Sequence, residues 1–373
     1  MISIVITSFN YERYIGETIH SAVEQDAAET EVIVVDDGSS DGSRGVIESF
    51  GDRIAAIFTD NHGQAAAQNT GYDVSRGEGV LFLDSDDVLL PHAARNVQAA
   101  LADPQIAKVH WTLPVIDADG RRTGMLQDRE LAEGDLRPHF FADGPLSNGT
   151  MPSPPTSGNA YARWFLEQVM PTPADIYWRS PDEYLFGLAP AYGPIARIES
   201  QSLYRIHGSN THLLRPFEMM LAFQLEHYET MLREGQRAAK SAGVEIDLAA
   251  WDGGAWWLRT SRAIATIERL VPEGETFAIA DETLLGFEPQ LRGRTVLPFP
   301  ELDDGEWGGN PEDDDDALRM LAELRASEVS FLAIAWPAFW WFAQYPRFAD
   351  QLRAQLRVLA EDDDLVLFSL RDG

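Results

Sequence analysis

The sequence predicts an α/β protein built on an open, mostly parallel sheet flanked by helices, followed by a helical segment and a small carboxy-terminal α/β domain. In the first hundred residues, short apolar runs alternate with helical patterns, as in βαβ units. Two runs, Val32 to Val35 and Val80 to Leu83, are continuously apolar, which is typical of strands buried on both faces by helices. After about residue 216 the composition changes to long amphipathic helical patterns.

The elements of residues 1–100 follow from this alternation. The predicted strands are Ile2 to Thr7, Glu31 to Asp36, Ile54 to Thr59 and Gly79 to Leu83. The predicted helices are Tyr14 to Gln25, Ser43 to Phe50 and Gly63 to Ser75. Open α/β sheets bind their ligands at the carboxyl ends of such strands, so we expect the functional residues there.

From residue 101 to about residue 215 the pattern loosens. We predict a strand at Lys108 to Ile116, a turn at Asp119-Gly120 and a loop in the Pro/Gly/Ser-rich stretch Gly144 to Gly158. Helices are predicted at Asn159 to Val169 and Asp182 to Tyr192, and a short apolar segment ends at Leu203 to His207. Residues 1–215 are therefore expected to form one domain.

Residues 216–272 are predicted to form a helical connector, and residues 273–373 a separate small α/β domain. The two connector helices are expected at Phe217 to Ala242 and Leu248 to Leu270. The strands predicted in the tail are Phe277 to Ala280, Thr295 to Pro298, Val329 to Ala335 and Leu365 to Leu370. Its predicted helices are Asp316 to Ala326 and Phe339 to Leu359.

The composition excludes several kinds of function. The chain has 29 Lys and Arg against 60 Asp and Glu, a formal net charge of −31, so nucleic acid is not an expected partner. Cysteine is absent, which excludes disulfides, thiolate zinc sites and a cysteine nucleophile. Any metal must therefore be held by oxygen or imidazole.

The apolar segments predict a cytoplasmic protein. The amino terminus shows no basic leader and only a short apolar run. The most apolar stretch, Val329 to Ala343, is shorter than the roughly 20 residues that span a bilayer. It is interpreted as a buried strand running into a helix, with peripheral membrane association as the alternative.

Polar clusters follow the first two predicted strands. Thr7, Phe9 and Asn10 form a polar and aromatic loop able to hydrogen-bond to a nucleobase and to stack on it. Asp36 and Asp37 are followed by Gly and Ser residues, which allow close backbone approach to a base or ribose. An ordinary turn is the alternative for each cluster, although a helix-capping turn does not explain two adjacent carboxylates.

Asp84 and Asp86 follow the fourth strand. In an extended segment, residues two apart point the same way, so these carboxylates can converge on one point. Such hard oxygen donors suit Mg²⁺ or Mn²⁺ bridging phosphate oxygens. The sequence therefore predicts a divalent cation here, and a surface Asp-x-Asp without a ligand is the alternative.

The motifs SFNYERYI, VVDDGSSDGS, NHGQAAAQNTG and VLFLDSDD, in this order, resemble the amino-terminal half of family 2 inverting glycosyltransferases of the GT-A fold. The resemblance covers about residues 1 to 100 and continues more weakly to about residue 210, through SPDEYLFGLAPAYGPI and LYRIHGSN. It implies a GT-A glycosyltransferase domain over residues 1–215, in which 1–100 bind the nucleotide sugar and 101–215 form the acceptor side.

The resemblance also implies roles for the residues that bind the nucleotide. Asp36 or Asp37 would hold the nucleobase, with Phe9 and Asn10 nearby, and Asp84 would contact the ribose.

Two further positions follow from the same comparison of motifs. Asp86 would coordinate the divalent cation, and His207 would be a further ligand of the metal or the diphosphate. In the third motif Asn69 is a candidate nucleotide contact. Gln68 stands where the family commonly has Arg, so this chain lacks a cation that could steady the diphosphate or a nearby loop.

The candidate catalytic base is Asp182, which lines up with the last acid of the family's Glu-Asp motif, here Pro-Asp. Glu183 is the second candidate, and both acids could instead favour a helix start through its dipole. Such a base would take the proton of an acceptor hydroxyl as that oxygen attacks the anomeric carbon, so that a single displacement inverts the configuration.

The sequence thus predicts a metal-dependent inverting glycosyltransferase that uses a nucleoside diphosphate sugar. Its acceptor would be a glycan, a lipid-linked saccharide or a small molecule in bacterial surface glycan or glycoconjugate synthesis. The alternatives are a metal-dependent nucleotidyltransferase and a non-catalytic nucleotide-sugar-binding protein. The first hundred residues contain neither a P-loop nor a Lys for a triphosphate, and no strand is followed by Gly-x-Gly-x-x-Gly.

Overall fold

The computed structural model describes residues 1–26, 29–127, 130–145, 153–208, 217–282, 290–291, 293–302 and 305–371. The chain divides into two compact units, which are described one at a time. The first contains Met1–Leu214 and Glu226–Ala255, and the second contains Arg215–Leu225 and Trp256–Gly373. Helix α8 (Phe217–Ala242) contributes residues to both units, so the helices expected as a connector are divided between them.

The first unit is built on a seven-stranded sheet in the order β10-β6-β9-β4-β1-β2-β3. Strand β9 is antiparallel to both neighbours, and all the other neighbouring strands are parallel. The predicted fold class, an open and mostly parallel sheet flanked by helices, is therefore confirmed. The strands are β1 (Ile2–Ser8), β2 (Thr30–Asp36), β3 (Ala55–Phe58), β4 (Gly79–Asp84), β6 (Lys108–His110), β9 (Asn159–Ala162) and β10 (Ile195–Arg197).

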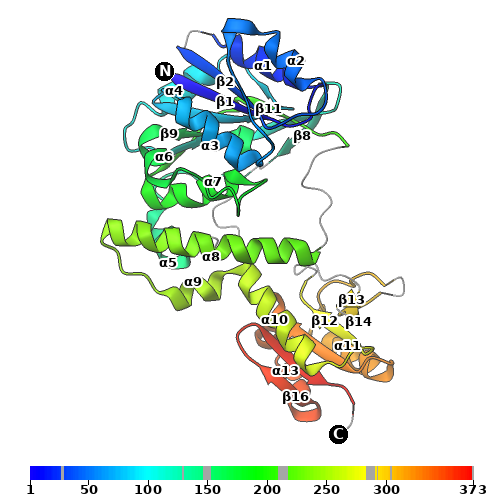
Figure 1. The fold of residues 1–373 in the computed structure, drawn as a ribbon. Helices are drawn as coiled ribbons and strands as arrows, with labels where there is room; N and C mark the ends of the chain where they lie inside the picture. Colours follow the sequence, from blue (N-terminus) through cyan, green and yellow to red (C-terminus); the bar gives the residue numbers. More distant parts are fainter. Residues whose placement is uncertain are drawn as a thin grey trace. The chain divides into compact units, whose positions relative to one another are not determined.

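Helices cover both faces of this sheet (Figure 1). In β1, Ile4 and Ile6 belong to one buried cluster and Val5 to another, because successive side chains of a strand point to opposite faces. The first cluster includes side chains of α1, α2 and α4, and the second includes side chains of α3, α6 and α7. These helices are α1 (Ile15–Val23), α2 (Ser43–Glu48), α3 (Gln64–Val74), α4 (Ala93–Ala100), α6 (Arg163–Val169) and α7 (Pro181–Tyr192).

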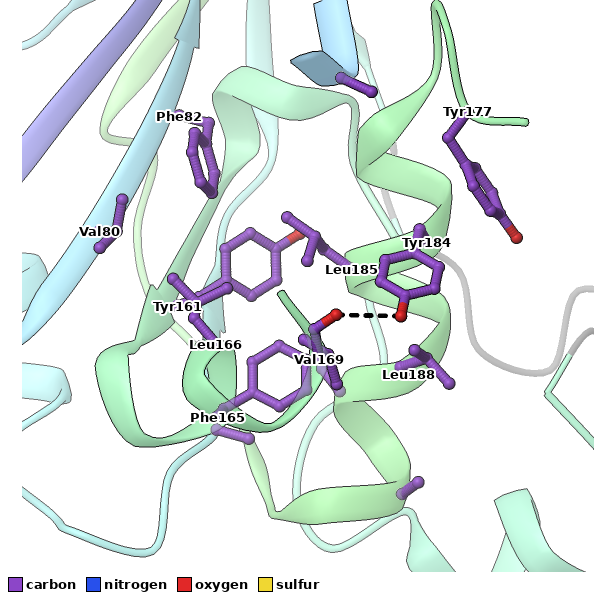
Figure 2. Close-up of a cluster of buried hydrophobic side chains, with 14 of the residues drawn as sticks. Val80, Phe82, Tyr161, Phe165, Leu166, Val169, Tyr177, Tyr184, Leu185 and Leu188 are labelled. Carbon is purple, nitrogen blue, oxygen red and sulfur yellow. Dashed lines mark hydrogen bonds between the residues drawn. The ribbon is translucent and has the colours of Figure 1, made fainter. Parts of the chain in front are cut away.

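Helix α7 is held by a dense apolar cluster on β4, β9 and α6 (Figure 2). Phe82 of β4 packs near Tyr161 of β9, with ring centroids 6.3 Å apart, and Leu185 of α7 is buried in the same cluster. The hydroxyl of Tyr184 donates to the carbonyl oxygen of Val169 at 3.0 Å. The first turn of α7, where Asp182 lies, is therefore fixed relative to the sheet.

The second half of the first unit corrects two predictions. Residues Asn159–Ala162, expected to begin a helix, form β9, because they pair with β4 on one side and β6 on the other. The single strand expected at 108–116 is broken by the buried Trp111, whose indole donates to Ser202 Oγ at 2.8 Å.

The segment after that break joins a separate four-stranded sheet in the order β5-β11-β7-β8. Its strands are β5 (Val88–Leu89), β7 (Leu113–Ile116), β8 (Arg122–Gln127) and β11 (Ser202–Arg205). The remaining elements of the first unit are η1 (Gly51–Arg53), α5 (Arg137–Asp143), η2 (Thr156–Gly158) and α9 (Leu248–Gly254). Part of the loop predicted at 144–158, and the end of the LYRIHGSN motif, lie outside the described residues.

The second unit contains a six-stranded sheet in the order β13-β14-β12-β15-β17-β16. Helix α10 packs on one face of this sheet, and α11 and α13 pack on the other. The further carboxy-terminal α/β fold is thereby confirmed. Its strands are β12 (Thr276–Ala280), β13 (Gln290–Leu291), β14 (Arg294–Pro298), β15 (Phe331–Ala335), β16 (Arg357–Glu361) and β17 (Leu365–Ser369). Its helices are α10 (Trp256–Leu270), α11 (Asp314–Ala326), η4 (Trp336–Ala338), α12 (Trp341–Gln344) and α13 (Pro346–Gln355).

Two long helices predicted in the carboxy-terminal part are shorter. The helix expected from Leu248 to Leu270 is interrupted at Ala255. The helix expected from Phe339 to Leu359 is interrupted before Pro346, and its last residues form β16, which pairs with β17. None of the helices in the described part of the chain has the length and apolar character that crossing a bilayer requires.

Candidate functional site

A cavity of about 340 Å³ lies at the carboxyl ends of β1, β2 and β4. Parallel strands end at one edge of a sheet, so polar residues that follow different strands meet there. Segments from the second half of the unit complete the walls. The lining residues are Thr7, Ser8, Phe9, Tyr11, Asp37, Asn61, Gly63, Gln64, Ala67, Asp84, Ser85, Asp86, Pro155, Thr156, Trp178, Arg179, Asp182 and Tyr204.

The loop after β1 brings Thr7 and Phe9 to the cavity, and the Phe9 side chain is 43% exposed. Asn10 is not among the lining residues. Its backbone has a positive φ of 60°, and its side-chain oxygen accepts a hydrogen bond from the backbone N–H of Ser40 at 2.7 Å. Asn10 therefore joins the loops that follow β1 and β2, while Phe9 presents an aromatic ring to the cavity.

Of the two acids after β2, Asp37 lines the cavity and Asp36 does not. The Asp37 carboxylate accepts hydrogen bonds from the backbone N–H groups of His62 and Gly63, at 2.9 and 2.7 Å. Asp36 is buried, and one of its oxygens accepts from the backbone N–H of Ser39 at 2.9 Å. Asp37 is thus oriented by the loop after β3, and Asp36 fixes the turn of its own loop.

Asp84 and Asp86 both line the cavity, as the Asp-x-Asp pattern predicts. The side chain of Gln64 donates to Asp84 Oδ1 at 2.7 Å. Burial raises the pKa of Asp84 well above its usual value, and the neighbouring charges of Asp86 and Asp182 raise it further. These carboxylates therefore repel each other across one small, partly dehydrated space.

His207 lies next to Asp86, which brings two distant predicted residues together. Its Nε2 is 2.8 Å from Asp86 Oδ2, and both residues are buried. The imidazole stacks on the ring of Tyr14, with centroids 4.8 Å apart, and meets the ring of Tyr11 edge-on. Tyr11 belongs to the polar and aromatic loop expected after the first strand. Tyr14 was not predicted as part of the site, because an aromatic residue at the start of an amphipathic helix carries no distinct signal.

The backbone around Asp86 is held by a buried arginine. Arg205 Nε donates to the Asp86 carbonyl oxygen at 2.7 Å, and the Arg205 backbone N–H donates to Asp87 Oδ1 at 2.8 Å. A terminal nitrogen of the same guanidinium is 2.7 Å from Glu17 Oε2. Asp87 does not line the cavity, so its part is to fix β11 against this segment.

Asp86 and His207 are chemically suited to a divalent cation, because they offer a hard oxygen and an imidazole nitrogen at one point. Burial is the main cause of the raised pKa of Asp84, and a cation there would offset the further contribution that comes from repulsion by Asp86 and Asp182. Within the described ranges, no group of three or more His, Asp or Glu side chains is arranged to hold a metal. The protein would therefore supply two ligands, and water or substrate oxygens the others.

The first turn of α7 separates the two candidate bases. Asp182 lines the cavity, whereas the carboxylate of Glu183 lies 2.9 Å from Nδ1 of His227. His227 belongs to α8 and is buried, and its ring packs on Tyr177 with centroids 4.1 Å apart. His227 was not predicted, because nothing in its own helical pattern marks a contact with a residue so far away in sequence.

The segment before α7 supplies Trp178 and Arg179, which were also not predicted. The indole of Trp178 packs on Gly63, where an added Cβ would lie 2.5 Å from the ring. The carbonyl oxygen of Trp178 accepts from the N–H of Ala65 at 3.4 Å. This segment is therefore packed on the start of α3, beside the loop that orients Asp37.

Asn69 does not reach the cavity. Its side-chain amide donates to the carbonyl oxygen of Thr172 at 2.8 Å and accepts from the N–H of Thr172 at 2.9 Å. Gln68 is buried in the protein, 1% exposed, and is likewise absent from the cavity wall. In this structure Asn69 holds the segment that leads to Trp178, and Gln68 does not replace a cation in the cavity.

The known proteins that are similar to this chain include glycosyltransferases. The family model described as "Glycosyl transferase family 2" matches residues 3–167. An uncharacterized glycosyltransferase of Nostoc sp. is 35% identical over 219 residues, which cover 57% of this chain and 66% of that protein. The succinoglycan biosynthesis protein ExoO of Rhizobium meliloti is 35% identical over 135 residues, which cover 35% of this chain and 38% of that protein. The chain thus spans less than two thirds of either relative.

Among solved structures, the crystal structure of TarS from S. aureus is similar to this chain. The match has a TM-score of 0.45 and a sequence identity of 18%. It covers 73% of this chain and 49% of TarS.

Proposed function

Because residues 3–167 of this chain belong to glycosyl transferase family 2, we propose that the protein is an inverting glycosyltransferase that uses a nucleoside diphosphate sugar. One observation carries the proposal. Phe9, Asp37, Asp84, Asp86 and Asp182 come from four separate segments and line one cavity of about 340 Å³. A nucleotide, a phosphate-bound cation and an acceptor base need this set of groups at this edge of an α/β sheet.

The nucleotide would occupy the part of the cavity near β1 and β2. Phe9 offers an exposed ring for stacking on the base, and Asp37 offers carboxylate oxygens that could accept hydrogen bonds from it. Asp84, at the end of β4, would contact the ribose. These roles agree with those that the sequence motifs imply for the same residues.

Asp86 and His207 would hold a divalent cation, Mn²⁺ or Mg²⁺, when the donor is bound. Bound there, the cation would act as a Lewis acid toward the departing nucleoside diphosphate. Arg205 contributes by fixing the backbone at Asp86, and Tyr14 by fixing the orientation of the His207 ring. The chain thereby orients the ligand atoms before the substrate arrives.

Asp182 would be the catalytic base, and Glu183 would not. Only Asp182 lines the cavity, while the carboxylate of Glu183 is directed at the buried His227. Asp182 would take the acceptor's hydroxyl proton as the acceptor oxygen forms its bond to the anomeric carbon and the bond to the diphosphate breaks. A single displacement of this kind inverts the anomeric configuration and needs no covalent sugar-enzyme intermediate.

The acceptor and the cellular role are part of the proposal. The name of one relative refers to succinoglycan biosynthesis, which supports a role in the synthesis of a surface glycan or glycoconjugate. The acceptor would be a glycan, a lipid-linked saccharide or a small molecule, handled in the cytoplasm, with peripheral membrane association as a further expectation.

A thermal-shift panel tests the proposal. UDP, GDP, dTDP and CDP are each added with Mn²⁺, Mg²⁺ or EDTA, because a ligand that binds only the folded state raises the melting temperature. Stabilisation by one nucleotide that needs the cation and disappears in Asp86→Ala supports the proposal. The absence of a shift with all four nucleotides contradicts it.

The reaction products separate the two alternatives. With the sugar donor and its acceptor, a glycosyltransferase releases a nucleoside diphosphate, whereas a nucleotidyltransferase acting on a nucleoside triphosphate releases pyrophosphate. A binding protein releases neither, although it would still show the thermal shift.

A further inference from the structure

We infer that Arg179 is the residue that binds the diphosphate of the donor, which makes it a substrate-contacting residue that no sequence motif marks. The inference rests on the proposed function and deepens it. It starts from the charges of the cavity. Four carboxylates line it, those of Asp37, Asp84, Asp86 and Asp182. Among the residues that the structure describes, Arg179 is the one Lys or Arg in the cavity wall.

This balance of charge is unfavourable for a nucleoside diphosphate. The donor adds about two negative charges to a space that already holds four carboxylates, and a divalent cation offsets only part of the sum. In a partly dehydrated cavity, like charges repel more strongly than in water, because the effective dielectric constant is lower. An arginine is well suited to offset the remaining negative charge, since its planar guanidinium can bind two phosphate oxygens at once.

The backbone that leads to Arg179 is held in place by contacts with neighbouring segments. The segment before it is fastened to α3 by the two hydrogen bonds between Asn69 and Thr172, at 2.8 and 2.9 Å. The buried Tyr177 donates to the carbonyl oxygen of His227 at 3.3 Å, and Trp178 packs on Gly63. The Arg179 side chain itself is exposed, so it can reach a ligand without disrupting the core.

The position of Arg179 also bears on the absence of an arginine at position 68. Gln68 stands where the resembling family commonly has Arg, yet Gln68 is buried away from the cavity. A positive charge from the segment before α7 therefore enters the cavity wall from the other half of the domain. Arg179 would therefore bind the diphosphate of the donor and not an acidic group of the acceptor.

The test compares diphosphate and monophosphate binding in four proteins: wild type, Arg179→Gln, Arg179→Lys and Arg76→Gln. Arg76 is a matched control, because it is exposed, is absent from the cavity wall and precedes β4 at the opposite edge of the sheet. Affinities for UDP and UMP, with the GDP, dTDP and CDP pairs in parallel, are measured by calorimetry with Mn²⁺.

We expect Arg179→Gln to weaken diphosphate binding about tenfold and monophosphate binding much less, as for loss of a charge-assisted contact to the outer phosphate. Arg179→Lys should recover part of the difference, and Arg76→Gln should behave as wild type. Equal weakening of both ligands, or no weakening, overturns the inference. Unchanged nucleotide affinity with slower transfer to an acidic acceptor overturns it in favour of an acceptor contact.

Two controls keep the result interpretable. The melting temperature of each variant without ligand is measured first, and Arg179→Lys decides the question if Arg179→Gln proves unstable. If the wild type binds none of the nucleoside diphosphates, the proposed function itself fails. If the wild type binds one and Arg179→Gln binds it equally well, only the role of Arg179 fails.

Discussion

Glu183 and His227 form a partly buried contact, with 2.9 Å between Oε2 and Nδ1, one residue away from the acid that faces the cavity. The contact joins the first turn of α7 to α8 and orients the carboxylate of Glu183 toward the protein interior. Because adjacent residues of a helix point in different directions, Asp182 is thereby left on the cavity side.

Substitutions at these two acids should therefore have different effects. Asp182→Asn is expected to lower kcat by about 10²- to 10⁴-fold with little change in nucleotide affinity, because a general base is lost and the shape is kept. Glu183→Gln should keep most of kcat and lower stability by about 1–3 kcal/mol through the contact with His227. Steady-state kinetics and denaturant unfolding of both variants check this. A larger loss of kcat in Glu183→Gln would reverse the assignment.

The pair of Asp86 and His207 predicts a second phenotype. Asp86→Ala and His207→Ala should each raise the Mn²⁺ concentration needed for half-maximal nucleotide binding by about tenfold or more, since each removes one of two ligands. Asp52→Ala, an exposed acid in η1, is the matched control. A cation titration at fixed nucleotide measures the effect, and identical titrations for all four proteins would exclude this cation site.

Gly63 should tolerate no side chain. Its φ is +89°, and an added Cβ would lie 2.5 Å from the ring of Trp178. Gly63→Ala is expected to lose about 1–3 kcal/mol of stability and to weaken nucleotide binding by displacing Trp178. Gly45→Ala, in α2 with nothing within 4 Å of its added Cβ, should be neutral or slightly stabilising. Equal unfolding free energies for the two variants would contradict this account.

His110 predicts a dependence of stability on pH. Burial lowers its pKa to about 3, and the neighbouring charge of Lys108 adds to the effect. The imidazole therefore stays neutral in the folded state but takes up a proton in the unfolded state below about pH 6.5. Because the unfolded state then binds more protons, stability is complete above about pH 6.5 and should fall by up to about 1.4 kcal/mol per pH unit below it.

The variant His110→Gln should remove this part of the pH dependence. Its side chain can still donate to the Ala132 carbonyl oxygen, which His110 Nε2 meets at 2.8 Å. Unfolding free energies between pH 4 and pH 8 for both proteins provide the comparison. Parallel curves would show that His110 does not contribute.

The sequence was most informative where the chemistry and the periodicity are local. The four strands up to β4 follow from apolar runs, and Asp37, Asp84 and Asp86 follow those strands directly. The same reasoning located Asp182 at the start of a helix.

It was less informative where contacts over long distances in the chain decide the structure. Asn159–Ala162 became a strand because β4 and β6 leave a place between them, which no propensity of these residues reveals. Arg179 reaches the cavity wall, and His227 reaches Glu183, by the same kind of long-range packing, without a motif of their own. Asn69 shows the converse case, because this residue of a recognisable motif contacts Thr172 and does not line the cavity.

The reversed direction of β9 has a consequence for how this site could diversify. Because β9 runs opposite to β4, the residues that precede it reach the cavity edge, where Thr156 lines the wall and Ser157 Oγ accepts from the Asp84 N–H at 3.1 Å. One wall is thus encoded by the first hundred residues and the other by segments between 155 and 204. Substitutions in the later segments would therefore change one wall of the cavity and leave unaltered the wall that the first hundred residues form.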